Sequence, residues 1–210
     1  MRKILFIFFN LILINTFAQK DNTTIPIELL IGHRRTNFQL NVNRSIYKNI
    51  RFMSMTSASA DYKNTKEESD LIMNNTVTYQ FYKNFNFGLG VQYHYFKGFI
   101  PELSASAIYA NQTWTLLLNP YFQLLPTINL ETVAMIEFKP LLTQSMRLYT
   151  QIQGLYNHNF TNKNHERSFY NFRLGLKINK ITFGAGARLD YYGAKKLNKE
   201  NYGVFFKYDF

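Results

Sequence analysis

The residues of this chain that could do chemistry are charged side chains at alternate positions of otherwise apolar segments. Charged residues make up only 18% of the 210 residues, yet the net charge is +11. A charge taken out of water is costly unless a partner lies beside it, so each of these residues is a candidate for a site. The candidate set is Glu102, Glu131, Glu137, Arg147, Arg173, Arg188 and Lys207.

Two kinds of chemistry are open to these charges: an ion-pair network that rigidifies the fold, or a polar path for a solute. Folding residues 137–147 about a turn near Leu142 would place Glu137 opposite Arg147, with both side chains pointing inward. The network is the favoured interpretation, because a partly buried charge needs a partner whether or not anything passes.

Catalytic and metal chemistry have less support. The chain has no cysteine, which excludes disulfides, thiolate metal sites and cysteine nucleophiles. Nothing in the spacing of the histidines requires several of them to converge, as a metal site would. We therefore expect no catalytic residue, no metal and no cofactor. The four histidines are His33, His94, His158 and His165.

An alternation with period two predicts the elements that position these residues. From Phe85 to Tyr95, apolar residues occupy one face and polar or small residues the other, which is the signature of a β-strand. The abundance of Tyr and Phe, 15 and 20 residues, fits strands because flat rings pack well on a pleated surface. The pattern predicts strands near 36–46, 49–61, 71–82, 85–97, 102–110, 113–124, 128–139, 145–157, 168–178, 181–192 and 201–210.

These strands predict an all-β fold, a single antiparallel up-and-down barrel. Each strand is about as long as the 9–11 residues that a tilted strand needs to cross a bilayer. An even number is required if both termini lie on one side, and Ile27 to His33 would supply the twelfth strand. The alternative is ten strands, with the segment before Tyr47 acting as a plug or extension.

The connections are expected to alternate in length, as in membrane barrels. Tight polar turns are predicted at Lys83-Asn84, Asn111-Gln112 and Asn179-Lys180. Longer external loops are predicted at 62–70, 157–167 and 193–200.

The first residues predict a secretory signal. Arg2 and Lys3 precede an apolar run over residues 4–14, and Thr16 and Ala18 are small residues at the spacing of a cleavage site. We therefore expect a signal peptide over 1–18 and a barrel domain over 19–210.

The bulk of the side chains predicts which face of the barrel is outside. The apolar faces are too bulky for a small barrel interior, whereas the opposite faces carry small residues such as Gly88, Gly90 and Ser104. The apolar faces should therefore meet lipid. Several large rings are nevertheless expected to point inward and narrow the bore: Tyr82, Phe96, Tyr121, Tyr149, Phe169 and Phe205.

The C-terminus resembles that of the outer-membrane β-barrel proteins of Gram-negative bacteria. Their last strand ends on an aromatic residue, preceded by apolar or aromatic residues at every second position. The matching residues here are Tyr202, Val204, Phe206, Tyr208 and Phe210. The resemblance implies an assembly signal, the barrel assembly machinery as a transient partner, and no particular activity.

Taken as such a barrel, the chain is expected to be a structural or accessory component of the outer membrane with a narrow polar lumen. The alternatives are a small porin for polar solutes and a membrane-embedded lipid-modifying enzyme. We expect contact with outer-membrane lipid and lipopolysaccharide, the latter through basic loop residues, and no nucleic acid. These loop residues are Lys163, Arg167, Lys195, Lys196 and Lys199.

Overall fold

The computed structural model describes residues 24–63 and 69–210. The expected signal peptide over 1–18 lies outside these residues. Within them, no helix is long and apolar enough to span a membrane.

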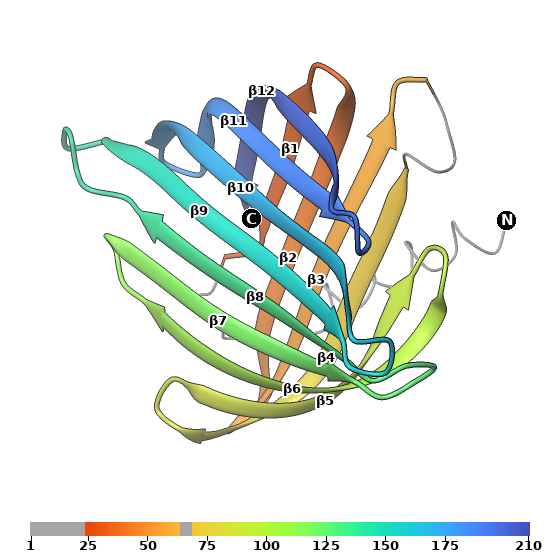
Figure 1. The fold of residues 1–210 in the computed structure, drawn as a ribbon. Helices are drawn as coiled ribbons and strands as arrows, with labels where there is room; N and C mark the ends of the chain where they lie inside the picture. The colour runs from red at the N-terminus through yellow and green to blue at the C-terminus, as the bar shows by residue number, and fades with distance from the viewer. Residues whose placement is uncertain (1–23, 64–68) are drawn as a thin grey trace, which may run out of the picture.

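Twelve antiparallel strands form one closed barrel, in which each strand pairs with its neighbours in sequence and β1 pairs with β12 (Figure 1). The prediction of twelve strands rather than ten is confirmed, and the segment before Tyr47 forms two strands of the wall. The strands are β1 (Pro26–Gly32), β2 (Arg35–Tyr47), β3 (Ile50–Asp61), β4 (Asp70–Tyr82), β5 (Phe85–His94), β6 (Gly98–Ala110), β7 (Trp114–Gln123), β8 (Asn129–Phe138), β9 (Met146–Asn159), β10 (Asn164–Ile178), β11 (Ile181–Tyr192) and β12 (Leu197–Asp209).

The two faces of the strands differ as the alternation predicts. On β5, Leu89 is 68% exposed on the outer wall, whereas Gln92 points inward and is 1% exposed. Successive side chains of a strand point to opposite faces, so the same alternation gives most strands an apolar outer face and a polar inner one. The interior surface of the barrel is called the lumen below.

The two ends of the barrel differ in their connections. Ile25 and Phe210 exchange backbone hydrogen bonds at one end, here called the terminal end. Two-residue turns close that end at 48–49, 83–84 and 179–180, and the first residue of each has a positive φ, as tight hairpins require. The opposite, loop end carries the connection 62–69 between β3 and β4.

Two of the three long loops predicted from the sequence are wrong in their extent. β9 continues to Asn159 and β10 begins at Asn164, and β12 begins at Leu197, so both connections are short. These strand ends are polar on both faces. Their inward side chains find hydrogen-bond partners inside the barrel, since the amide of Asn129 donates to Asn157 at 3.2 Å.

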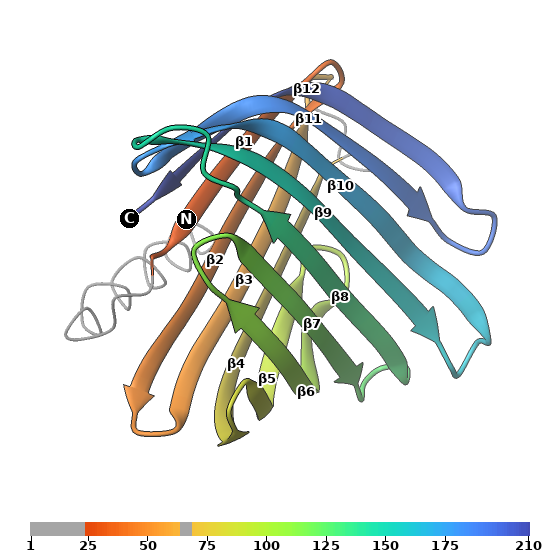
Figure 2. The same cartoon turned by 90° about the vertical axis from the view of Figure 1, so that its left-hand side faces the viewer.

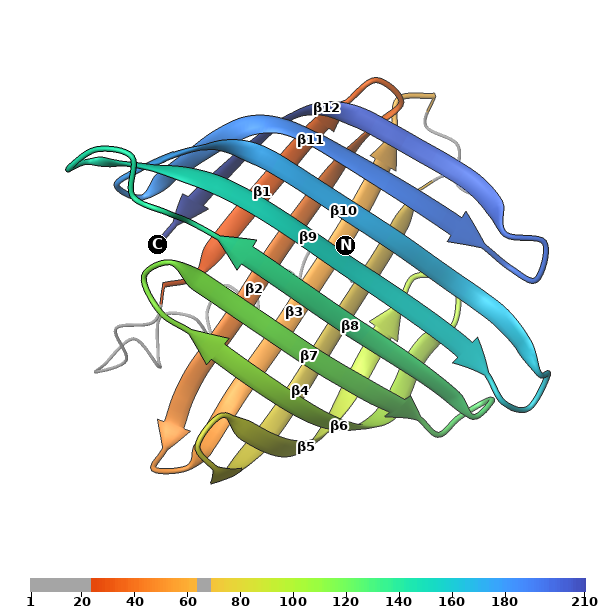
Figure 3. The same cartoon turned by 60° about the vertical axis from the view of Figure 1, so that its left-hand side comes forward.

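Glycines let neighbouring strands approach closely at several places in the ring. A Cβ atom on Gly90 of β5 would lie 2.4 Å from the carbonyl oxygen of Asn75, and one on Gly203 of β12 would lie 1.9 Å from that of Ile31. Only glycine permits so close an approach of neighbouring strands. Across the lumen, a wall of β1–β4 faces a wall of β6–β11, and the strands of the two walls cross in Figures 2 and 3.

Candidate functional site: a lumen closed by side chains

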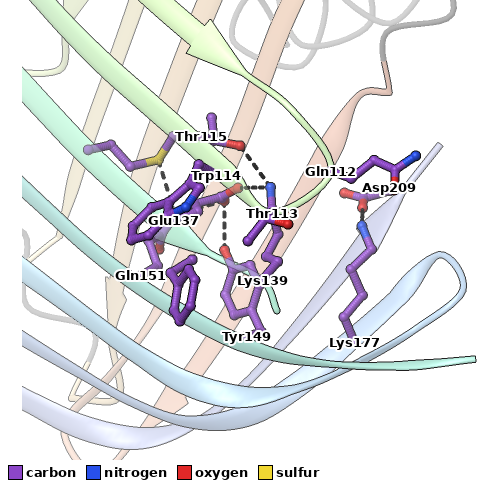
Figure 4. A network of polar contacts seen from close by, with 12 residues as sticks. Gln112, Thr113, Trp114, Thr115, Glu137, Lys139, Tyr149, Gln151, Lys177 and Asp209 are labelled. Carbon is purple, nitrogen blue, oxygen red and sulfur yellow. Dashed lines mark hydrogen bonds and ion pairs between the residues drawn. The ribbon is translucent and has the colours of Figure 1, made fainter. Parts of the chain in front are cut away.

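At the terminal end, a network centred on Glu137 of β8 joins β8 and β9 to β12 across the lumen. Figure 4 shows the part of it around Glu137, Lys139 and Tyr149. Lys139 and Lys207 each donate a hydrogen bond to the Glu137 carboxylate at 2.7 Å, and the Tyr149 hydroxyl donates at 2.8 Å. The Lys207 ammonium also donates to the Tyr149 oxygen at 2.9 Å. Two of the residues proposed from the sequence, Glu137 and Lys207, therefore meet although they lie 70 positions apart.

The predicted pairing of Glu137 with Arg147 is wrong. The turn between β8 and β9 is centred later than assumed, so Glu137 lies opposite Gln151, and Arg147 lies opposite Leu141 in an isolated bridge. The Arg147 guanidinium sits near the rim and donates to the carbonyl oxygens of Lys139 and Gln112 at 3.0 and 3.2 Å. Arg147 is therefore a rim residue that holds two connections together.

Farther into the lumen, Arg173 of β10 forms an ion pair with Glu28 of β1. The guanidinium lies 2.8 Å from the carboxylate, and the two side chains are 2% and 6% exposed. Glu28 was not among the charges singled out from the sequence. Its inward position on a short first strand was the only available signal.

The middle of the lumen holds an apolar cluster, called the plug below. It consists of Tyr121, Val133, Leu155 and Phe169 from β7 to β10, all between 0 and 4% exposed, and Met55 of the opposite wall packs against it. These side chains remove water from the centre of the barrel. A smaller apolar group of Leu30, Tyr149 and Phe205 fills the lumen nearer the terminal end.

Four of the six aromatic residues expected inside the barrel are therefore buried there. Tyr82 and Phe96 are not, since they are 56% and 55% exposed. An irregularity between Gln80 and Tyr82 shifts the register at the end of β4, and Phe96 lies in the connection after β5.

Toward the loop end, a second ion-pair network centres on Asp190 of β11. Its carboxylate accepts hydrogen bonds from Arg167 at 2.8 and 3.0 Å, from Arg188 at 3.1 Å and from the Tyr192 hydroxyl at 3.1 Å. Arg167 also pairs with Asp70 of the opposite wall. Arg188 was expected in the lumen, whereas the placement of Arg167 in an exposed loop is wrong.

The early start of β10 explains the position of Arg167. A bulge between His165 and Arg167 precedes it, and from Arg167 onward the register is unbroken, so Arg167 points inward like Phe169, two residues later. The lysines expected beside it, Lys163, Lys195 and Lys196, are exposed at the loop end. Contact between these exposed lysines and anionic lipid headgroups stays a prediction.

The last two candidate charges, Glu102 of β6 and Glu131 of β8, lie between the plug and the loop end. Glu131 accepts hydrogen bonds from the amides of Asn157, Gln92 and Asn74 at 2.9, 3.1 and 3.4 Å. Glu102 is 2% exposed, and no described residue donates a hydrogen bond to either of its carboxylate oxygens.

Above Glu131, the lumen widens into a cavity of about 240 Å³ that we call the vestibule. Its walls come from both sides of the barrel and reach the loop end. The residues that matter below are Asp70, Gln92, Lys97, Glu131, Glu166 and Arg167.

Among the described residues, no group of three or more His, Cys, Asp and Glu side chains is arranged to hold a metal ion. One serine–histidine pair exists that sequence reasoning missed, because the bulge creates it. His165 lies 3.0 Å from the Ser168 hydroxyl and 2.8 Å from the carbonyl oxygen of Gly193. Both side chains are buried, so this pair fixes the bulge and is closed to a substrate.

The comparisons with known proteins concern the fold. No protein-family model matches the chain, and no curated protein sequence matches it. Among solved structures, the NanC porin superposes with a TM-score of 0.51 at 12% identity, over 89% of this chain and 98% of that one. The chain has the fold of an outer-membrane β-barrel.

Two further structures with this outer-membrane β-barrel fold are similar over most of their length. The KdgM porin gives a TM-score of 0.45 at 13% identity, over 90% of this chain and 99% of that one. An outer membrane channel from Pseudomonas putida F1 gives 0.43 at 10% identity, over 89% and 92%.

The outer wall carries the surface that this fold presents to lipid. Large apolar side chains such as Leu89, Ile152 and Leu174 are exposed in the middle of their strands. Exposed rings lie near both ends, with Tyr47 and Trp114 at the terminal end and Phe99 at the loop end. An apolar band between aromatic girdles is typical of membrane barrels. The C-terminal residues Tyr202, Val204, Phe206, Tyr208 and Phe210 are likewise exposed on this wall.

Proposed function

We propose that this chain spans the bacterial outer membrane and serves there as a structural or accessory component whose lumen does not conduct. The observation that carries the proposal is the plug, because Val133 is 0% exposed and Phe169 is 4% exposed at the centre of the barrel. The apolar outer wall supports the location, since it would be unfavourable in water.

Contacts between the two walls support closure along the lumen. Gln39 of β2 bonds Gln153 of β9 at 3.2 Å, and Arg173 of β10 pairs with Glu28 of β1 at 2.8 Å. Barrels of about 8 strands are filled by side chains, whereas those of about 16–18 strands enclose a channel. The contacts across the lumen give this twelve-strand barrel the filled interior of a smaller one.

A small porin is the second candidate, favoured by the vestibule. That cavity is polar and reaches the loop end, as the entrance of a solute path would. In this candidate the plug is a gate, and side-chain movement would join the vestibule to the terminal end.

A planar-bilayer conductance measurement on the refolded protein tests both candidates. We expect no steady conductance from the wild-type chain, and ion conductance from Phe169→Ala combined with Phe205→Ala, because these truncations open the plug and the apolar group nearer the terminal end. Leu174→Ala is the matched control, since Leu174 lies on β10 but faces outward, 58% exposed. Steady wild-type conductance similar to that of the double variant would contradict the closed barrel and favour the porin.

A further inference from the structure

Two carboxylates in the lumen lie on either side of strand β7, and neither forms an ion pair with a described residue. Glu102 on β6 and Glu131 on β8 are 2% and 3% exposed. Gln123 of β7 lies opposite Glu102, and Tyr121 of β7 lies opposite Glu131. Their backbones are thus about 12 Å apart, because two strand spacings combine with an offset of two residues along β7, and both side chains point into the lumen. The charged neighbour of Glu102 is Glu131 itself.

The polar atoms around this pair are short of hydrogen-bond donors. Both carboxylate oxygens of Glu102 and the Oδ1 atoms of Asn74 and Asn119 are buried and accept no hydrogen bond from any described residue. The Asn74 amide donates to Glu131 at 3.4 Å, and the Asn119 amide donates to the Tyr121 hydroxyl at 2.6 Å. Asn74 thus contacts Glu131 directly, whereas Asn119 contacts Tyr121, the residue opposite Glu131. Leaving the unsatisfied oxygens without donors is costly.

The basic side chains nearest to the pair have other partners. Arg167 is close enough to act on Glu131, but its guanidinium bonds go to Asp70 and Asp190. Lys97 forms its ion pair with Glu166 at 2.8 Å. Two buried carboxyl groups without an ion-pair partner and several unsatisfied acceptor atoms consequently remain in this part of the lumen.

We propose that Glu102 and Glu131, together with Asn74, form a cation-binding site below the vestibule, whose lining includes Glu131. A set made only of carboxylate and amide oxygens suits a hard metal ion such as Ca²⁺, Mg²⁺ or Na⁺. It also suits a small primary ammonium, which donates three hydrogen bonds and accepts none. The vestibule runs from Lys97 near the loop end to Glu131, so it supplies the route of entry.

Equilibrium dialysis of the refolded full chain against CaCl₂, MgCl₂, NaCl or methylammonium chloride tests this site directly. We expect one bound cation per chain, with at least tenfold weaker binding in Glu102→Gln, which keeps the shape and removes the charge. Glu200→Gln is the matched control, because Glu200 is an exposed carboxylate near the same end that pairs with Arg34. Its binding should equal that of the wild type.

Thermal unfolding in detergent gives a second, independent readout. In cation-free buffer, Glu102→Gln should unfold at a higher temperature than the wild type, because it removes a buried charge without a partner. Saturating cation should raise the unfolding temperature of the wild type and leave that of Glu102→Gln unchanged.

The outcomes separate the possible occupants. Binding of a metal ion, or of methylammonium alone, supports the site and identifies its ligand class. Failure of the wild type to bind any of the four cations overturns the proposal, as does equal binding by Glu102→Gln. An infrared band of a protonated carboxyl group that persists at saturating cation and disappears in Glu102→Gln also overturns it, since a proton would then occupy the site in place of the cation.

Discussion

Removing the charge of Glu137 should destabilise the barrel more than any other single isosteric change at the terminal end. Glu137→Gln leaves two ammonium groups, Lys139 and Lys207, facing a neutral amide at the 2.7 Å distances that each now holds to the carboxylate. The side chains of Glu137 and Lys207 are 7% and 10% exposed, so water cannot replace the lost interaction. Breaking a buried ion pair from one side costs about 3–5 kcal/mol, and we expect a loss in this range.

A double-mutant cycle isolates the ionic contribution. Lys207→Met removes one of the two ammonium groups, so the double variant with Glu137→Gln should be more stable than the sum of the single changes predicts. We expect a coupling of about 2 kcal/mol, within the usual range for contacting residues. Arg147→Met is the matched control, because Arg147 bonds backbone carbonyl oxygens and makes no ion pair with Glu137. Its coupling to Glu137→Gln should stay below about 0.5 kcal/mol.

Reversible urea unfolding in lipid vesicles measures these quantities, with fluorescence from the chain's one tryptophan, Trp114. Its ring lies 4.3 Å from that of Phe138 at the terminal end. Equal couplings for the two cycles would refute the reasoning, because they would show that the Glu137 carboxylate does not act through Lys207.

Two further predictions concern the outer wall and the last residue. Leu89→Arg, in the middle of β5, should lower the free energy of unfolding in vesicles by about 2–4 kcal/mol. Tyr47→Arg, at the end of β2, should lower it by only about 0–1 kcal/mol. Equal losses would mean that the outer wall does not face lipid. Deletion of Phe210 should reduce the amount of folded protein in the outer membrane far more than Tyr202→Ala does, because the Phe210 backbone also closes the seam with Ile25; normal accumulation of the truncated chain would argue against the assembly signal.

Much of the fold could be predicted because the alternation that identifies a strand lies in consecutive residues of the sequence. The alternation around Phe85 to Tyr95 determines both the strand and the face of each side chain. The partners across the lumen could not be predicted in this way. Glu137 and Lys207 meet only because the ring closes and flattens, and Glu28 reaches Arg173 for the same reason.

The positions of strand ends and turns caused the other errors. The turn between β8 and β9 is centred later than assumed, so Glu137 lies opposite Gln151. Strand β10 begins at Asn164, so Arg167, which the sequence placed in a loop, lies in the wall of the barrel and points inward. For the candidate site, the sequence predicted which charged side chains point into the lumen, but it did not predict which of them form pairs.

The contacts between the two walls have a geometric consequence for the barrel as a ring. Twelve hydrogen-bonded strands fix its perimeter, but a ring of fixed perimeter encloses less area when its sides are drawn together than when it is round. Side chains that bond across the lumen, such as Gln39 with Gln153, hold opposite sides of this ring together. The area it encloses is therefore set by side-chain contacts as well as by the number of its strands.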